Sequence, residues 1–266
     1  MAGLTKVKGS GLATGAATAS LVGIDDNATS TAITIDASEN VGIGVVPESW
    51  YSQFKALQLG EGGSIWGRTG GGVYPAQVYV AANTYYNTSG SERYITTNAA
   101  SQYSQTVGTH SFQVAPSGTA GAAITWTNAM TIDNGGIITT PNQPAFSVYA
   151  SSQTYLVNTD VAVDLVNEEF DIGNNFASTK FTAPVAGSYL FTGAIQYSGN
   201  GTAHINFIKN GSFVNNGWLD YGDTKAASQT RILYLNANDY VQLKLYHSIA
   251  GTVNAERTRM TGYLIG

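Results

Sequence analysis

The residues that could perform acid–base chemistry are few and badly spaced for it. Glu168 and Glu169 are adjacent, so on a strand their side chains would point to opposite faces. Two carboxylates that cleave a glycosidic bond must instead flank that bond. The other candidate acids lie in segments expected to be loops, where solvated turn residues are ordinary: Asp25, Asp26, Asp220 and Asp223. We assign no catalytic residue and expect the protein not to be an enzyme.

The chain also lacks the ligand sets of a metal or a phosphate-bearing cofactor. His110, His204 and His247 are far apart in sequence and show no H-x-x-x-H spacing, so a zinc site is not expected. The absence of cysteine excludes disulfides and thiolate metal sites. The stretches GEGGS and RTGGGV have neither the strand–loop–helix context nor the lysine of a phosphate-binding loop. We therefore predict no metal and no cofactor.

Charge is scarce in this sequence. Only 11% of the 266 residues are charged and the net charge is −5, whereas 43% are hydrophobic. Such a chain should fold, but so little charge gives a free monomer poor colloidal stability. The composition favours a subunit that hides much of its surface in an assembly over an ordinary acidic soluble protein. Its mild acidity argues against a nucleic-acid binder, which normally shows a basic stripe.

Residues 1–31 are rich in Gly, Ala, Thr and Ser and hold too few large apolar residues for a core. No continuous apolar stretch follows Lys6 and Lys8, so the segment is expected to be neither a Sec signal peptide nor a membrane span. We interpret it as an anchor to a partner protein, with Leu4, Lys6 and Lys8 as its candidate contacts, and expect no membrane insertion.

Residues 32–143 read as short strands separated by glycine-rich turns. TAITIDASENVGIGV alternates Ile33 and Ile35 with polar residues before a turn, and AMTIDNGGIITTP repeats the pattern. Isolated two-stranded hairpins are barely stable in water, so these hairpins need partners. Only one short stretch, residues 48–59, carries a helix-like spacing of apolar residues: Trp50, Phe54 and Leu57.

The first of these hairpins resembles a recurrent segment of bacteriophage tail-fibre and related virion proteins. In that segment an alternating strand leads into an N-V-G-I-G turn, a proline and another strand. Asn40-Val41-Gly42-Ile43-Gly44 and Pro47 carry the match here. AMTIDNGGIITTPNQPAF resembles the joint by which such fibres lead into a distal domain. The resemblance implies a virion protein on the tail or capsid surface, assembled in the host cytoplasm.

Residues 144–266 carry an ordered series of motifs that resembles the globular-head family of complement component 1q. That family shares its jelly-roll fold with tumour necrosis factor. The matching residues are Phe181, Pro184, Gly187, Tyr189 and Phe191; Lys209, Asn210 and Gly211; Leu233, Leu235, Asp239, Val241 and Leu243; and Gly262, Tyr263, Leu264 and Ile265. Asn238 replaces a common Gly, but Asn also tolerates the left-handed backbone region. The resemblance implies a hairpin at K-N-G and a strand pair over 231–247.

Pro184 and Gly187 interrupt an apolar run, and we interpret them as a corner between two strands in different parts of the sandwich. Tyr189 and Phe191 then share one strand face and Leu190 the other, so both faces are largely apolar. A strand of this kind is buried on both faces, and the resembled family buries the second in a threefold trimer. The expected core or trimer aromatics are Phe181, Tyr189, Phe191 and Tyr263.

The loop at 215–230, NNGWLDYGDTKAASQT, mixes aromatic residues with Ser, Gly and Asn, as adaptable recognition surfaces do. The segment 196–204 has a similar composition. Aromatic faces stack on sugars and carboxylates accept sugar hydroxyls. The candidate receptor-binding residues are therefore Trp218, Asp220, Tyr221 and Asp223. Interface and core positions favour the same aromatic types, so burial of Trp218 and Tyr221 stays open as the alternative.

The sequence therefore predicts an all-β homotrimeric virion protein. It would comprise an anchor at 1–31, a glycine-rich fibre-type region of strands and hairpins at 32–143, and a jelly-roll β-sandwich head at 144–266. The expected function is that of a short tail fibre, whose head binds a host-surface glycan or protein and whose anchor contacts other virion proteins. Two alternatives stay open: a capsid decoration or head-fibre trimer, and a bacterial surface or spore-coat protein.

Overall fold

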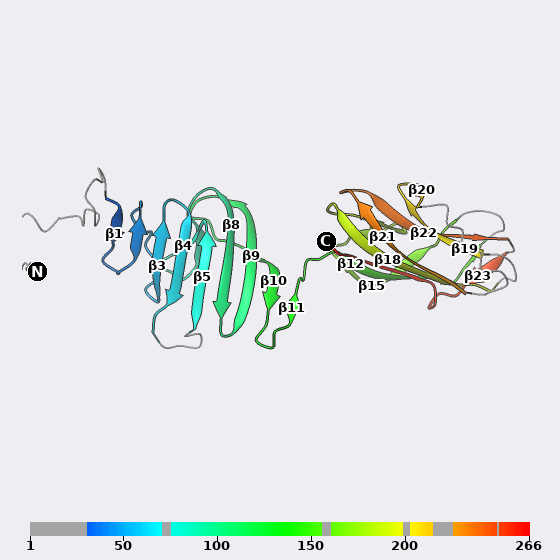
Figure 1. The fold of residues 1–266 in the computed structure, drawn as a ribbon, viewed down its shortest axis with the longest axis horizontal. Coiled ribbons are helices and arrows are strands. Elements are labelled where there is room, and N and C mark those ends of the chain that lie inside the picture. The colour runs from blue at the N-terminus through cyan, green and yellow to red at the C-terminus, as the bar shows by residue number, and fades with distance from the viewer. Residues whose placement is uncertain (1–30, 71–75, 156–160, 199–202, 215–225, 249) are drawn as a thin grey trace, which may run out of the picture. The chain divides into compact units, whose positions relative to one another are not determined.

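The computed structural model describes residues 31–70, 76–155, 161–198, 203–214, 226–248 and 250–266. The regular secondary structure within them consists of β-strands alone, so the all-β expectation is confirmed for the described part of the chain. In the same residues no helix is long and apolar enough to cross a membrane. The chain divides into two compact units between Thr140 and Pro141, close to the expected boundary after residue 143. Each unit is described by itself (Figure 1).

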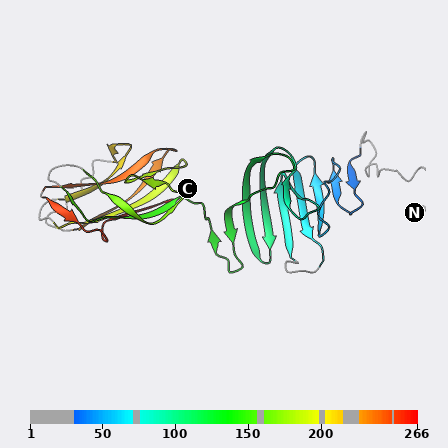
Figure 2. The ribbon, with the colours of Figure 1, turned by 180° about the vertical axis from the view of Figure 1, so that it is seen from behind.

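The N-terminal unit is built on one nine-stranded sheet whose strands follow one another almost in chain order (Figures 1 and 2). Its neighbours pair antiparallel except β2 and β3, which are parallel. The strands in sheet order are β1 (Ile33–Ile35), β2 (Val41–Ile43), β3 (Phe54–Leu59), β4 (Gly63–Arg68), β5 (Gln77–Ala82), β8 (Asn98–Thr106), β9 (Thr109–Gly118), β10 (Thr127–Ile132) and β11 (Ile138–Thr139). A separate hairpin, β6 (Thr84–Tyr86) and β7 (Glu92–Tyr94), is inserted between β5 and β8.

An aromatic cluster covers one face of this sheet, which we call the covered face. Trp66 is almost fully buried and stacks on Tyr79, with ring centroids 4.9 Å apart and planes 4° apart. Tyr86 of the β6–β7 hairpin packs against Phe54 at 4.7 Å, and Trp50 lies 5.3 Å from Trp66. The hairpin therefore shields these rings from water and supplies the partner that a half-apolar sheet requires.

The one helix candidate of the sequence, residues 48–59, does not form a helix. Residues 54–59 form strand β3, whose side chains alternate between the two faces of the sheet. Phe54 and Ala56 are buried on the covered face while Leu57 points to the opposite one. Trp50 precedes strand β3, and Phe54 and Leu57 lie on opposite faces of it. The spacing of four and three residues between them therefore reflects no helix.

The C-terminal unit is a jelly roll of two main sheets packed face to face. The five-stranded sheet has the order β15-β12-β24-β18-β21 and the six-stranded sheet the order β16-β17-β22-β19-β20, with β14 beside β22 and a small β13–β23 pair. The strands are β12 (Ala145–Ala150), β13 (Gln153–Tyr155), β14 (Val161–Ala162), β15 (Leu165–Ile172), β16 (Phe176–Ala177), β17 (Lys180–Thr182), β18 (Gly187–Gln196), β19 (Ala203–Lys209), β20 (Ser212–Phe213), β21 (Ala226–Leu235), β22 (Tyr240–His247), β23 (Gly251–Val253) and β24 (Arg259–Leu264).

The expected corner at Pro184 and Gly187 is present. Strand β17 belongs to the six-stranded sheet and β18 to the five-stranded sheet, so the chain changes sheets between Thr182 and Gly187. The Tyr189 hydroxyl donates to the Val185 carbonyl at 2.8 Å and fastens the corner. A side chain at Gly187 would approach Leu264 Cδ1 to 2.7 Å, so this position needs glycine for space.

A second corner corrects the expected strand pair at 231–247. Strand β21 pairs with β18, whereas β22 pairs with β17 and β19 in the other sheet. The two strands are consecutive but lie on opposite sides of the core. Asn238, at the turn between them, has the left-handed φ of 72° that the sequence suggested. By contrast, the expected hairpin at Asn210-Gly211 is confirmed, since β19 and β20 pair through a turn with φ angles of 49° and 83°.

Candidate assembly face and distal groove

The five-stranded sheet turns one face to the core and the other, which we call the outer face, away from it. Cross-strand register sets two rows over all five strands. The first row is Ile232, Leu190, Tyr263, Ala145 and Ile172, and the second is Thr230, Thr192, Thr261, Ser147 and Phe170. Neither row contains a charged residue. The first row holds no small polar side chain, whereas the second combines Phe170 with hydroxyl side chains that can be desolvated at modest cost.

Large apolar side chains on this face are open to solvent in the single chain. Ile232 is 63% exposed, Tyr234 62%, Phe170 50% and Tyr263 49%. Leu190, between Ile232 and Tyr263, is half-buried. Apolar side chains that gather on one continuous face mark an interaction surface, whereas scattered ones need no explanation. The outer face is therefore a candidate assembly face.

The aromatic residues singled out from the sequence fall into two groups. Phe181, Tyr189 and Phe191 are at most 1% exposed and lie in the core between the sheets. Phe181 is packed 5.4 Å from Tyr189 and 5.7 Å from Phe191, measured between ring centroids. Tyr263 lies on the outer face instead. The sequence did not distinguish core aromatics from interface aromatics. The pairing register places Tyr263 on the outer face and the other three in the core.

A shallow groove of about 490 Å³ lies at one end of the jelly roll. The chain enters the domain at Ala145, which pairs with Tyr263, whereas Ala150, at the other end of β12, bonds to Thr258 next to the groove. We therefore call it the distal groove; β23, which lines it, is drawn at the end of the domain away from the C-terminus (Figure 1). Its lining residues are Ser152, Gln196, Tyr197, Ser198, Thr252, Val253, Asn254 and Arg257.

The distal groove is lined mainly by polar residues, and hydrogen bonds connect several of them. The Thr252 amide donates to Ser198 Oγ at 3.0 Å, and the Arg257 amide donates to Asn254 Oδ1 at 3.1 Å. The sequence indicated the whole segment 196–204 as recognition-like. Gln196 to Ser198 line the groove, 199–202 lie outside the described residues, and 203–204 begin strand β19. No sequence signal pointed to Asn254 or Arg257, because only the sheet register brings 252–257 beside 196–198.

The receptor-binding candidates Trp218, Asp220, Tyr221 and Asp223 lie outside the described residues, as do the anchor candidates Leu4, Lys6 and Lys8. Ala226 is the first described residue after the receptor-binding candidates. It is also the first residue of β21 and pairs with Gln196 of the distal groove. Residues 226–230 of the expected loop are therefore strand, because they pair with β18, and the described chain resumes beside the distal groove.

Several carboxylates among the described residues have shifted pKa values, among them Asp239 and Glu92. A hydrogen bond from Lys209, with further ones from Asn210 and the Asn236 amide, lowers the pKa of Asp239 to about 2. Its carboxylate lies 2.9 Å from Lys209 Nζ and receives the Asn210 side-chain amide at 2.6 Å, which ties two turns together. In the N-terminal unit, burial raises the pKa of Glu92, partly offset by a 2.5 Å hydrogen bond from Trp126 Nε1.

Some of the acids and histidines considered from the sequence lie in the described residues of the head. Glu169 accepts a 2.6 Å hydrogen bond from Ser147 and lies 3.8 Å from Arg259, so it has a structural environment. His247 pairs with Ala203 and His204 with Tyr246, which directs the two imidazoles to opposite faces of the sheet. No group of three or more His, Asp or Glu within the described part of the chain could hold a metal ion.

Comparison with known proteins agrees with this architecture. The family model of the C1q domain matches residues 145–265. The globular domain of the zebrafish complement 1qA protein is 18% identical, with 47% of this chain and 98% of that one covered and a TM-score of 0.34. Murine APRIL is 11% identical, with 46% and 99% covered and a TM-score of 0.37. No curated protein matches the chain. By the family model, residues 145–265 form a C1q domain.

Proposed function

We propose that the chain is a structural virion protein, a trimeric short tail fibre whose distal head binds a glycan or protein on the host surface. The observation that carries the proposal is the apolar row Ile232–Leu190–Tyr263 on the outer face. A free monomer with 11% charged residues would leave this row in water. Closed point-group symmetry lets identical subunits cover such a face without generating filaments.

The phage setting is supported by the N-V-G-I-G turn at Asn40–Gly44 and the fibre-like joint that precedes the head. In the proposal, residues 1–31 contact other virion proteins, assembly takes place in the host cytoplasm, and the head points away from the particle. Recognition belongs to the distal groove and the segment 215–225, because Gln196 of the groove pairs with Ala226, the residue that follows this segment. A trimeric head would carry three such binding sites. Their simultaneous binding would convert a weak affinity per site into a strong overall affinity.

The oligomeric state tests the assembly face. Light scattering after size exclusion should give about three times the chain mass of 27.9 kDa. Ile232→Asp should reduce it to the mass of one chain, because a carboxylate in a desolvated interface lacks a partner. Val46→Asp, at a 72% exposed position outside the strands, is the matched control and should remain trimeric. A soluble wild-type monomer at micromolar concentration contradicts the proposal.

Adsorption tests the attachment function. Trp218→Ala combined with Tyr221→Ala should abolish particle adsorption to host cells while mass and melting temperature stay near wild type. A collapsed melting temperature would identify these aromatics as core residues. Labels on the N-terminus in intact particles should map to the tail; a shell location would favour a capsid decoration protein instead.

A further inference from the structure

The nine-stranded sheet has a second face, which we call the open face, opposite the aromatic cluster. Register carries one apolar row across seven consecutive strands. The row is Val41, Leu57, Ile65, Val80, Tyr103, Phe112 and Met130. Ile35, paired with Val41, extends it to β1. Flanking positions on the same face add further apolar side chains: Ile43, Leu59, Val78, Val114, Ile132 and Ile138.

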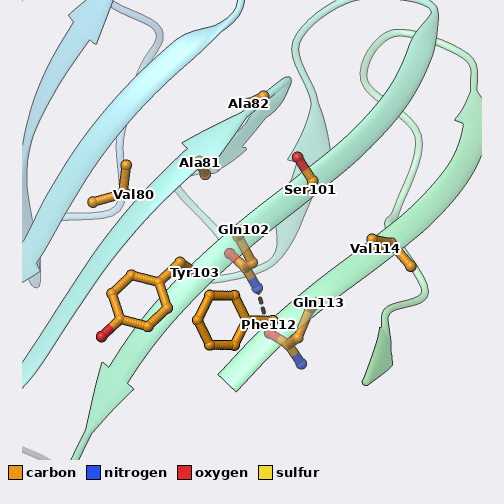
Figure 3. A pocket seen from close by; sticks show the side chains of 9 residues that line it. All are labelled: Val80, Ala81, Ala82, Ser101, Gln102, Tyr103, Phe112, Gln113 and Val114. Atoms are coloured by element: carbon orange, nitrogen blue, oxygen red, sulfur yellow. Dashed lines mark hydrogen bonds between the residues drawn. The ribbon is translucent and has the colours of Figure 1, made fainter. Parts of the chain in front are cut away.

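This face is hollowed at its centre. A groove of about 480 Å³ runs over β5, β8 and β9, with Val80, Tyr103 and Phe112 among its lining residues. Figure 3 shows the rings of Tyr103 and Phe112 side by side on neighbouring strands, with centroids 4.9 Å apart. Val80 is 48% exposed and Phe112 39% exposed. The groove is therefore lined by large apolar groups that no described residue of the chain covers.

Area and charge restrict what can cover the open face. Its nine exposed large apolar residues together present roughly 800 Å² to solvent, which is the area that one partner contributes to a standard interface. They are Ile35, Ile43, Leu59, Ile65, Val78, Val80, Phe112, Val114 and Ile138. Lys55 is the one charged strand residue on this face among those described, and it is already paired with Glu39 at 3.0 Å. A charged partner would find nothing complementary here.

We propose that the open face is covered by the open faces of other copies of this chain, so that the N-terminal units together form a packed β stem. This inference rests on the proposed trimer. Only residues 140–144 separate β11 from β12, and five residues reach at most about 18 Å. A trimeric head would therefore hold the sheets at high effective concentration. Three such faces would turn inward around the threefold axis, and interdigitation of apolar side chains, as between packed sheets, suits uninterrupted apolar rows.

A photo-crosslinking amino acid tests this packing in the full chain. p-Benzoylphenylalanine replaces Phe112 and, as the matched control, Phe213, which is 44% exposed on β20 of the head. Nitrogen-14 and nitrogen-15 chains are co-assembled and irradiated. At position 112 we expect covalent dimers in which peptides of opposite isotope join residue 112 to the open face, with a yield at least fivefold above position 213. Val80→Asp should lower the yield at least fivefold, and Val46→Asp should leave it unchanged.

Mass and crosslinks together separate this inference from the proposed trimer. A trimer with mixed-isotope crosslinks at position 112 supports both. A trimer whose residue 112 crosslinks only within its own chain, including to residues 1–30, overturns the stem and leaves the head intact. A monomer without crosslinks overturns both. A dimer with mixed-isotope crosslinks supports the sheet packing and overturns the threefold head.

Discussion

Gly262 of β24 lies directly between Phe146 and Phe191 of the two neighbouring strands, and the two rings fill the space that a side chain would need. The register pairs Gly262 with both phenylalanines. A Cβ at Gly262 would stand 2.7 Å from Phe146 Cε1 and 2.8 Å from Phe191 Cδ1. Both rings are at most 1% exposed, so neither can swing into solvent. This close approach explains why glycine precedes Tyr263 in the last strand.

The first prediction follows from that packing. Gly262→Ala should lower the free energy of unfolding by about 1–3 kcal/mol, the usual cost of overpacking a core. Denaturant titration of the full chain measures it. Gly62→Ala, in a turn of the N-terminal unit where the nearest atom to an added Cβ is the Asn83 amide nitrogen at 4.0 Å, controls for the loss of a glycine. Unchanged stability of Gly262→Ala would show that the rings repack freely.

Several features of the head follow from local sequence chemistry. Pro184 and Gly187 predict a break, and Asn210-Gly211 predicts a tight turn, because backbone angles depend on the residues themselves. The pairing of β21 and β22 was wrong for a different reason. A short turn between apolar strands suits both a hairpin and a change of sheet, and only packing across the core decides between them. Likewise, the open face depends on the order of nine strands, which no spacing within one strand reveals.

The second prediction concerns Asp239 and acid. Its pKa is lowered from 3.8 to about 2 by Lys209 and Asn210, so the ionised form stabilises the folded state. That contribution is complete above pH 3.8 and is lost as pH falls towards 2. Asp239→Asn should therefore be less stable than wild type at pH 7, and the difference should shrink between pH 4 and 2. Thermal unfolding across pH measures this, with exposed Glu256→Gln as control; a constant difference between the variants would refute the assignment.

The third prediction concerns Glu92, whose pKa is shifted in the opposite direction to that of Asp239. Burial raises its pKa from 4.5, so the folded state favours the protonated acid. The stabilising contribution is present below pH 4.5 and is lost as pH rises through the raised pKa. Glu92→Gln keeps an acceptor for Trp126 Nε1 and should make the N-terminal unit at least as stable as wild type at pH 7. The control is Glu61→Gln, at an exposed turn. Lower stability of Glu92→Gln at pH 7 would contradict the desolvation argument.

The last prediction concerns the distal groove. Arg257 is the one charged residue among those lining it, and its planar guanidinium can donate several hydrogen bonds to sugar hydroxyls or carboxylates. Arg257 is exposed, so Arg257→Ala should leave mass and melting temperature unchanged. Adsorption of particles to host cells should fall at least tenfold, because the loss would be repeated at the three sites of the proposed trivalent head. Lys244→Ala removes an equal charge from the six-stranded sheet, away from the groove, and should adsorb normally. Normal adsorption of Arg257→Ala, together with failure of the Trp218 and Tyr221 variant, would restrict recognition to the segment 215–225.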